Sequence, residues 1–162
     1  MSQLTGINFS LREEHQAVLL AARDFAQNEL FPGVIERDNA QAFDPHLLQQ
    51  MGELGFMGMM VSPEFGGSGM DTMSYVIAME EICKVDASAG VIMSVNNSLV
   101  CWGLEKFGSA EQKQKYLVPL AQGKVIGAFC LSEPEAGSDA TSQHTTGIWD
   151  QHKYLLNGTK NW

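Results

Sequence analysis

The residues whose types and spacing are best suited to chemistry lie in one short stretch of this sequence, Phe129 to Asp139. There an apolar run with the composition of a β-strand, Lys124 to Leu131, leads into two serines, three carboxylates, a proline and a glycine. Such a turn places backbone N–H groups and hydroxyls at the end of a strand. It can therefore hold a planar heteroaromatic cofactor or a pyrophosphate and stabilise negative charge that develops on it. The alternative interpretation is a polar turn that only connects two strands.

Neither the cysteines nor the histidines have the spacing of a metal site. Cys83, Cys101 and Cys130 are too far apart for a metal or redox pair, and each has apolar neighbours in the sequence, so we expect reduced thiols in a cytosol-like compartment. Residues 1–10 have neither the apolar core of a secretion signal nor the arginine-rich character of a transit peptide, so no targeting segment is expected. The histidines, interpreted as surface or polar-network residues, are His15, His46, His144 and His152.

Composition restricts the class of protein. A chain of 162 residues forms one sizeable domain, or one domain and a fragment, and its hydrophobic content of 44% supports a core. The net charge of −9 argues against nucleic acid or an anionic membrane as a partner, because both require a basic face. The longest nearly uncharged run, Ala87 to Gly103, contains Asn96 and Asn97, which predicts a buried helix and not a membrane span.

Two helices are predicted before residue 56. Ser10 and Glu13 have the spacing of a capping box, and an apolar stripe at helical spacing follows until Pro32 and Gly33 stop it. Asp44 with Pro45 opens the second helix, which ends at Gly55. The inward positions are Leu11, Val18, Ala22, Phe25, Ala26 and Leu30 in the first helix, and Leu47, Leu48, Met51 and Leu54 in the second.

A glycine-rich loop, Pro63 to Gly69, separates these helices from a longer helical region, and we expect no regular structure in it. A helix capped by Asp71 or Thr72 runs to about Val85, and its apolar band is broad enough for burial on more than one side. Further helices are predicted over Ala87 to Phe107 and Ala110 to Leu120, the last capped by Ser109 with Gln112. Together these elements indicate a helical bundle.

The pattern changes to short β-like segments after residue 123. Strands are predicted over Val125 to Leu131, Thr145 to Trp149 and Tyr154 to Leu156, and Asn157 with Gly158 predicts a hairpin whose next strand starts at Thr159. We therefore expect an α+β fold, an N-terminal all-α helical bundle followed by the beginning of an antiparallel β-domain. A sheet that stops in mid-hairpin is typical of the front part of something longer.

With these helices followed by Ser-Glu-Pro-Glu-Ala-Gly-Ser-Asp, Ser132 to Asp139, and by Leu-Asn-Gly-Thr-Lys-Asn-Trp, Leu156 to Trp162, the sequence resembles the acyl-CoA dehydrogenases over essentially its whole length. It is most similar to the short-chain, butyryl-CoA type. The resemblance implies an N-terminal helical domain (1–122) and a truncated middle β-domain (123–162), without the C-terminal helical domain. Other segments that carry the resemblance are Ala78 to Ile82, Gly90 to Leu99 and Lys106 to Gln114.

The resemblance also implies an FAD site. Leu131 and Ser132 would donate hydrogen bonds to the pyrimidine edge of the isoalloxazine, where negative charge collects after hydride transfer. Ser138, beside the flexible Gly137, would contact the CoA thioester arm, and Trp162 would pack against the flavin, although it could simply cover a sheet. The cofactor-binding residues implied are Phe129, Cys130, Leu131, Ser132, Gly137, Ser138 and Trp162.

The resemblance places Val91 to Val100 at the far end of the fatty-acyl pocket. Ile92, Met93 and Val95 would then favour a short acyl tail, with Ile92 and Val95 in contact with the substrate, while the alternative is that each is an ordinary core residue. Two positions depart from the family pattern. Glu135 stands where relatives commonly have a small residue, which makes the turn more acidic, and Asn161 stands where an apolar or small residue is common.

The activity implied is the oxidation of short-chain acyl-CoA to trans-2-enoyl-CoA, in fatty-acid β-oxidation or amino-acid catabolism. Electrons would pass to electron-transferring flavoprotein from a homotetramer, in the bacterial cytoplasm or the mitochondrial matrix. The family's glutamate base belongs to the C-terminal domain, so we expect no catalytic residue here and neither activity nor tight FAD binding from this chain alone. The glutamates not assigned as base are Glu80, Glu81, Glu133 and Glu135.

Two other functions stay open at this level. The chain could be a non-catalytic remnant that acts as a helical interaction module, for which a native stop codon after Trp162 would be the sign. It could also be the front part of an acyl-CoA oxidase, which has the same fold but passes electrons to oxygen. The reaction of the reduced flavin with oxygen would separate an oxidase from a dehydrogenase.

Overall fold

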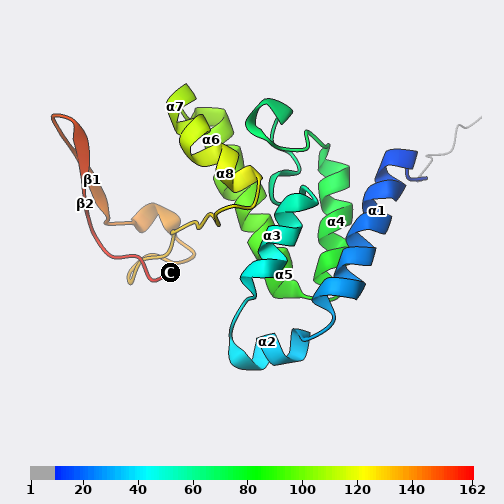
Figure 1. Ribbon diagram of the computed structural model, residues 1–162. Coiled ribbons are helices and arrows are strands. Elements are labelled where there is room, and N and C mark those ends of the chain that lie inside the picture. The colour runs from blue at the N-terminus through cyan, green and yellow to red at the C-terminus, as the bar shows by residue number, and fades with distance from the viewer. Residues whose placement is uncertain (1–9) are drawn as a thin grey trace, which may run out of the picture. The chain divides into compact units, whose positions relative to one another are not determined.

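The computed structural model describes residues 10–162 and divides the chain into two compact units, Met1–Gly127 and Ala128–Trp162. The first unit is helical, and the second contains a two-stranded antiparallel sheet (Figure 1). This confirms the predicted α+β class. The expectation that no targeting segment is present concerns mainly residues 1–9, which lie outside the described residues.

The helical unit is built from short helices, several of which continue one another. The predicted helices over residues 87–107 and 110–120 are confirmed as continuous segments that contain π-helical turns. The elements are α1 (Glu13–Phe25), η1 (Ala26–Leu30), α2 (Val34–Ala40), α3 (Pro45–Glu53), η2 (Phe56–Gly58), η3 (Pro63–Phe65), α4 (Thr72–Cys83), α5 (Ala87–Ser94), η4 (Val95–Cys101), α6 (Trp102–Phe107), α7 (Ala110–Gln112), η5 (Lys113–Leu117) and α8 (Val118–Ala121).

The caps of these helices are partly those predicted. Asp44 and Asp71 accept hydrogen bonds from the backbone N–H of the first turn of α3 and α4, and Ser109 forms a complete capping box on α7. The prediction of a capping box at Ser10 was wrong, because the N-cap of α1 is Arg12. Ion pairs from Arg12 to Glu14 (2.7 Å) and to Asp71 (2.5 Å) hold the start of α1 beside α4 (Figure 1).

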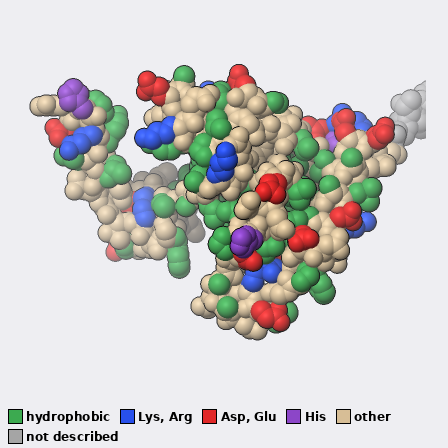
Figure 2. Space-filling view, in the orientation of Figure 1, with side chains coloured by type: hydrophobic (Ala, Val, Ile, Leu, Met, Phe, Trp, Pro, Cys, Tyr) green, Lys and Arg blue, Asp and Glu red, His purple; other side chains and the backbone are tan. Residues whose placement is uncertain are grey.

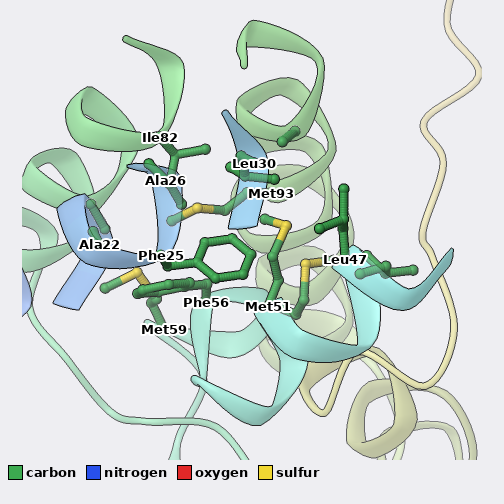
Figure 3. Close-up of a cluster of buried hydrophobic side chains, with 14 residues drawn as sticks. Ala22, Phe25, Ala26, Leu30, Leu47, Met51, Phe56, Met59, Ile82 and Met93 are labelled. Carbon is green, nitrogen blue, oxygen red and sulfur yellow. The ribbon is translucent and has the colours of Figure 1, made fainter. Parts of the chain in front are cut away.

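The main core lies where α1, η1 and α3 meet α4 and α5. Phe25 and Phe56 pack with their ring centroids 5.9 Å apart (Figure 3), and methionines fill the space around them, as the sequence predicted. Leu54 was wrongly predicted to face inward. It follows the last residue of α3, precedes Gly55 in a left-handed conformation, and is 49% exposed. The fully buried methionines are Met51, Met57, Met59 and Met93.

The segment Ala87–Phe107 is long and apolar enough to cross a membrane by length and composition alone. Its buried face, however, carries two amide side chains with protein partners. Asn96 Nδ2 donates to the carbonyl of Met57 (2.7 Å), and Asn97 Nδ2 donates to that of Phe56 (2.8 Å). Buried polar groups with such partners belong to a protein interior, so this helix contributes to the core, as predicted.

Helix α4 packs on two helices, α1 and α5, yet its broad apolar band is only partly buried. Ile77 and Ile82 are buried against the core, but Met73 and Val76 are about half exposed. The two helices with which α4 makes its main contacts, α1 and α5, therefore leave part of this band exposed. Hydrophobic side chains are visible on the surface of the helical unit (Figure 2). The glycine-rich loop also differs from the prediction, since η3 adds one 3-10 turn to it.

The second unit is organised around a β-hairpin. Strands β1 (Thr146–Asp150) and β2 (Lys153–Asn157) pair antiparallel, with Asp150 opposite Lys153, which confirms two predicted strands. The strands predicted over 125–131 and from Thr159 were wrong. A strand requires a neighbouring strand for its backbone hydrogen bonds, and β1 and β2 are the only strands that pair within the described residues.

Candidate functional site

The segment Phe129 to Ser132 is exposed up to Leu131 and half-buried at Ser132, and it is held through the carbonyl groups of Leu131 and Ser132. The carbonyl oxygen of Leu131 accepts hydrogen bonds from Gln143 Nε2 (2.5 Å) and Lys160 Nζ (3.0 Å), and that of Ser132 accepts one from the backbone N–H of Asn161 (2.8 Å). Within residues 10–162, the backbone N–H groups of Leu131 and Ser132 and the Ser132 hydroxyl have no partner. The segment therefore offers three free donors.

A buried carboxylate fixes the turn that follows these donors. Glu133 pairs its backbone with Ala136, and its side chain accepts hydrogen bonds from Lys160 Nζ (2.8 Å) and from the backbone N–H groups of His144 (2.6 Å) and Thr145 (3.1 Å). The bond from Lys160, followed by those from Thr145 and His144, lowers the pKa of Glu133 to about 2. Glu133 is therefore ionised at neutral pH and poorly suited to act as a base there.

The rest of the predicted site is exposed. Gly137 and Ser138 lie at the surface, and Ser138 has no hydrogen-bond partner among the described residues. Hydrogen bonds from Ser142 and then Thr141 lower the pKa of Asp139 and close a short helical turn beside Ser138. Trp162 is 88% exposed. Its segment lies next to the segment with the free donors, because the backbone N–H of Asn161 bonds to the carbonyl oxygen of Ser132.

The three cysteines are free thiols in two kinds of environment. Cys101 is buried in the helical unit, and burial raises the pKa of its thiol to about 12. Cys83 and Cys130 are exposed, although Cys130 has an apolar residue on each side in the sequence and Cys83 follows Ile82. Cys130 therefore lies on the surface of the segment that carries the free donors.

The two predicted acyl-pocket residues belong to the helical unit and are partly buried. Ile92 on α5 packs against the main core and lines a cleft of about 790 Å³ between α2 and the start of α5. Val95, the first residue of η4, does not line this cleft. Arg37 and Asp86, which form an ion pair of 3.0 Å, make one wall of the cleft polar.

One group of side chains in the described part of the chain has the composition of a cation site, namely Glu14, His15 and Asp71, whose ligand atoms lie within 4.8 Å of one another. Arg12 Nη2 lies within 2.8 Å of a ligand atom of each of the three and so occupies the position that a cation would take. The hydrogen bond from the backbone N–H of Ser74, followed by the contact with His15 Nε2 at 3.1 Å, holds the pKa of Asp71 well below its ordinary value. His15 is thus a buried member of a polar network, one of the two environments expected for it.

The family model described as "Acyl-CoA dehydrogenase, N-terminal domain" matches residues 12–124. The chain belongs to the acyl-CoA dehydrogenase family. It is 49% identical over 152 residues to the human "Short-chain specific acyl-CoA dehydrogenase, mitochondrial", a match that covers 94% of this chain and 37% of the human protein. The chain spans about two fifths of the length of the curated relatives that it matches and corresponds to the N-terminal part of these oxidoreductases.

Solved structures agree with this assignment. Butyryl-CoA dehydrogenase from Megasphaera elsdenii has a TM-score of 0.88 and 39% identity over 95% of this chain and 41% of its own. A second similar chain belongs to the structure called "Electron transferring flavoprotein of Acidaminococcus fermentans: Towards a mechanism of flavin-based electron bifurcation". It has a TM-score of 0.91 and 46% identity, and the match covers 95% of this chain and 40% of that one. The structure "PigA with FAD and proline" has a TM-score of 0.89 and 28% identity, and the match covers 95% of this chain and 41% of that one.

Sequence reasoning missed the contacts that organise the site. Glu133 and Lys160 lie inside the two motif segments that carry the family resemblance, but their ion pair joins residues that are far apart in the sequence. Helix α2 was missed as well, because its seven residues bury no side chain completely and so give no apolar stripe. The only available signal for the ion pair was the presence of opposite charges in two otherwise recognisable motifs.

Proposed function

We propose that this chain supplies the N-terminal helical domain (1–122) and the start of the middle β-domain (123–162) of an FAD-dependent enzyme that oxidises short-chain acyl-CoA to trans-2-enoyl-CoA. The names of the similar proteins, short-chain specific acyl-CoA dehydrogenase and butyryl-CoA dehydrogenase, support the substrate class. The observation that carries the proposal is the set of three free donors at Leu131 and Ser132.

These donors fit a flavin. The pyrimidine edge of an isoalloxazine presents oxygen and nitrogen acceptors, and two backbone N–H groups with one hydroxyl complement such an edge. When bound, FAD would supply the hydride acceptor of the reaction. Leu131 and Ser132 would hold its ring and stabilise negative charge on it, because donors on a fixed backbone need little reorganisation. Trp162 would cover the ring and exclude water.

The other site residues would bind the substrate. Ser138, exposed and unpartnered next to Gly137, is suited to contact the CoA thioester arm. Ile92 and Val95 are assigned to the end of the acyl pocket, where bulky side chains limit the length of the tail. None of the glutamates of this chain is assigned as the base that removes the α-proton, and the Glu133 carboxylate already has three donors.

The electron acceptor and assembly follow from the same assignment. We propose electron-transferring flavoprotein as the acceptor and a homotetramer as the assembly. The similar chain in a structure named after an electron transferring flavoprotein supports the acceptor. The cellular place is proposed as the bacterial cytoplasm, or the mitochondrial matrix in a eukaryote, since the similar curated proteins come from both kinds of organism.

A substrate series on the complete protein that carries this sequence tests the proposal. Butyryl-CoA should give the highest kcat/KM, with octanoyl-CoA and palmitoyl-CoA progressively poorer, and electron-transferring flavoprotein should reoxidise the flavin faster than oxygen does. Fastest turnover of palmitoyl-CoA would refute the short acyl tail. Rapid reoxidation by oxygen alone would instead identify an acyl-CoA oxidase, and a complete protein that binds no FAD would favour the non-catalytic interaction module.

A further inference from the structure

Lys160 and Glu133 connect two segments of the chain within the unit Ala128–Trp162. Lys160 Nζ lies 2.8 Å from Glu133 Oε1 and also donates to the carbonyl oxygen of Leu131 at 3.0 Å. The next residue, Asn161, donates its backbone N–H to Ser132 at 2.8 Å. Lys160 and Asn161 therefore bind the carbonyl groups of Leu131 and Ser132, two consecutive residues of the other segment.

The carboxylate of this pair is buried and the ammonium is partly buried. The Glu133 side chain is 4% exposed and the Lys160 side chain 26%. A carboxylate with so little access to water depends on its donors, and Lys160 is its only charged partner among the described residues. Removing the ammonium group would leave Glu133 with the backbone N–H groups of His144 and Thr145 alone.

We propose that Lys160 and Glu133 are positioning residues for the cofactor-binding segment. Their ion pair keeps the Leu131 carbonyl bonded within the unit, so that the neighbouring amides are held in place and stay free for a ligand. Neither side chain touches the cofactor in this account. The inference rests on the proposed function, because it takes those amides as donors to FAD.

The variant Lys160→Met removes the charge and the donor but keeps a side chain of similar length. Lys153→Met is the matched control, since Lys153 is an exposed lysine of the same unit and forms no ion pair with a described residue. In the complete protein without FAD, hydrogen–deuterium exchange at the Asn161 amide reports on the bond to Ser132. We expect faster exchange there in Lys160→Met and exchange like that of the parent protein in Lys153→Met.

FAD binding is the second measurement. Because a hydrogen bond to a charged group is lost, the dissociation constant of FAD should rise about tenfold in Lys160→Met and stay unchanged in Lys153→Met. Glu133→Gln should have a similar effect, and the double variant should be little worse than either single variant, because the two residues act as one unit. Lys160→Arg, which keeps the positive charge and its donors, should restore most of the affinity.

The outcomes separate the inference from the proposed function. If the parent protein binds FAD and Lys160→Met binds it equally well with unchanged exchange at Asn161, the positioning role is wrong and the proposed function stands. If Lys160→Met and Glu133→Gln have additive effects, or Lys160→Arg fails to recover binding, the paired role is also wrong. If the parent protein binds no FAD but Lys160→Met still accelerates exchange, the proposed function fails and the ion pair is structural only.

Discussion

The side chain of Glu81 shows how single residues hold this fold together. It is buried on α4 and bonds to Arg23 of α1 (2.9 Å) and to Lys84 (2.7 Å). The hydrogen bond from Arg23, followed by that from Lys84, lowers the pKa of Glu81 from 4.5 to about 2. Because the folded-state pKa lies below the ordinary value, this contribution to stability is present above pH 4.5 and is lost as the pH falls toward 2.

We predict that Glu81→Gln lowers the free energy of unfolding at pH 7 by about 2 kcal/mol, because two charge-assisted hydrogen bonds are weakened. The difference from the parent protein, measured by urea unfolding, should shrink as the pH falls below 4.5. The control is Glu80→Gln, which affects an exposed ion pair to the same Lys84 and should cost less than about 0.5 kcal/mol. Equal losses for the two variants, or a difference independent of pH, would contradict this account.

At the residue scale, the sequence identified the right stretch but not its hydrogen bonds. The stretch Phe129 to Asp139 was singled out because a polar turn follows an apolar run, which is a local pattern, and the family resemblance then pointed to Leu131 and Ser132 within it. Which of their backbone groups are free depends on Gln143, Lys160 and Asn161, which approach only in the folded chain. No spacing rule connects these positions. The family resemblance could therefore name the donors, but only the folded structure shows that they are not already hydrogen-bonded.

At the scale of elements, the distance between neighbouring backbones decides which side chains fit at a given position of a helix. Gly52 on α3 lies against the end of α8, and a Cβ at this position would lie 2.9 Å from the Cα of Gly123 and closer still to the carbonyl oxygen of Gln122. At Gly103 on α6, apart from its chain neighbours and the backbone of its own helix, no described atom lies within 4 Å of where a Cβ would be. The two glycines therefore differ in packing although both lie in helices.

We predict opposite effects for the same substitution at these positions. Gly52→Ala should destabilise the protein by about 1 to 3 kcal/mol, because backbone atoms cannot yield easily to an added methyl group. Gly103→Ala should stabilise it by about 1 kcal/mol, because alanine loses less conformational freedom in a helix. Thermal unfolding of both variants beside the parent protein checks this. Stabilisation by Gly52→Ala would show that α3 and α8 are not packed as described.

Helices were predicted better than strands, and the reason is physical. The stripe that includes Ala22, Phe25 and Leu30 is a local signal, and these residues are indeed buried. The run Val125 to Leu131 has strand-like composition, yet a strand forms only with a partner, and none of the described strands pairs with it. Met73 and Val76 were misjudged likewise, because apolar character does not reveal which face a neighbour covers.

At the scale of the whole molecule, the chain corresponds to about two fifths of its curated relatives. The free donors lie on an exposed segment, where three hydrogen bonds alone hold a ligand weakly. We predict that the 162-residue chain by itself does not retain FAD through gel filtration and does not oxidise butyryl-CoA, whereas the complete protein does both. A yellow 162-residue fragment whose flavin is bleached by butyryl-CoA would refute this prediction.

The central claim is that the backbone amides of Leu131 and Ser132 bind the flavin ring. A crystal structure of the complete protein with FAD tests it most directly. The account predicts that both amide nitrogens lie at hydrogen-bond distance, about 3 Å, from acceptors on the pyrimidine edge of the isoalloxazine. A flavin bound elsewhere, with these two amides facing solvent, would contradict it.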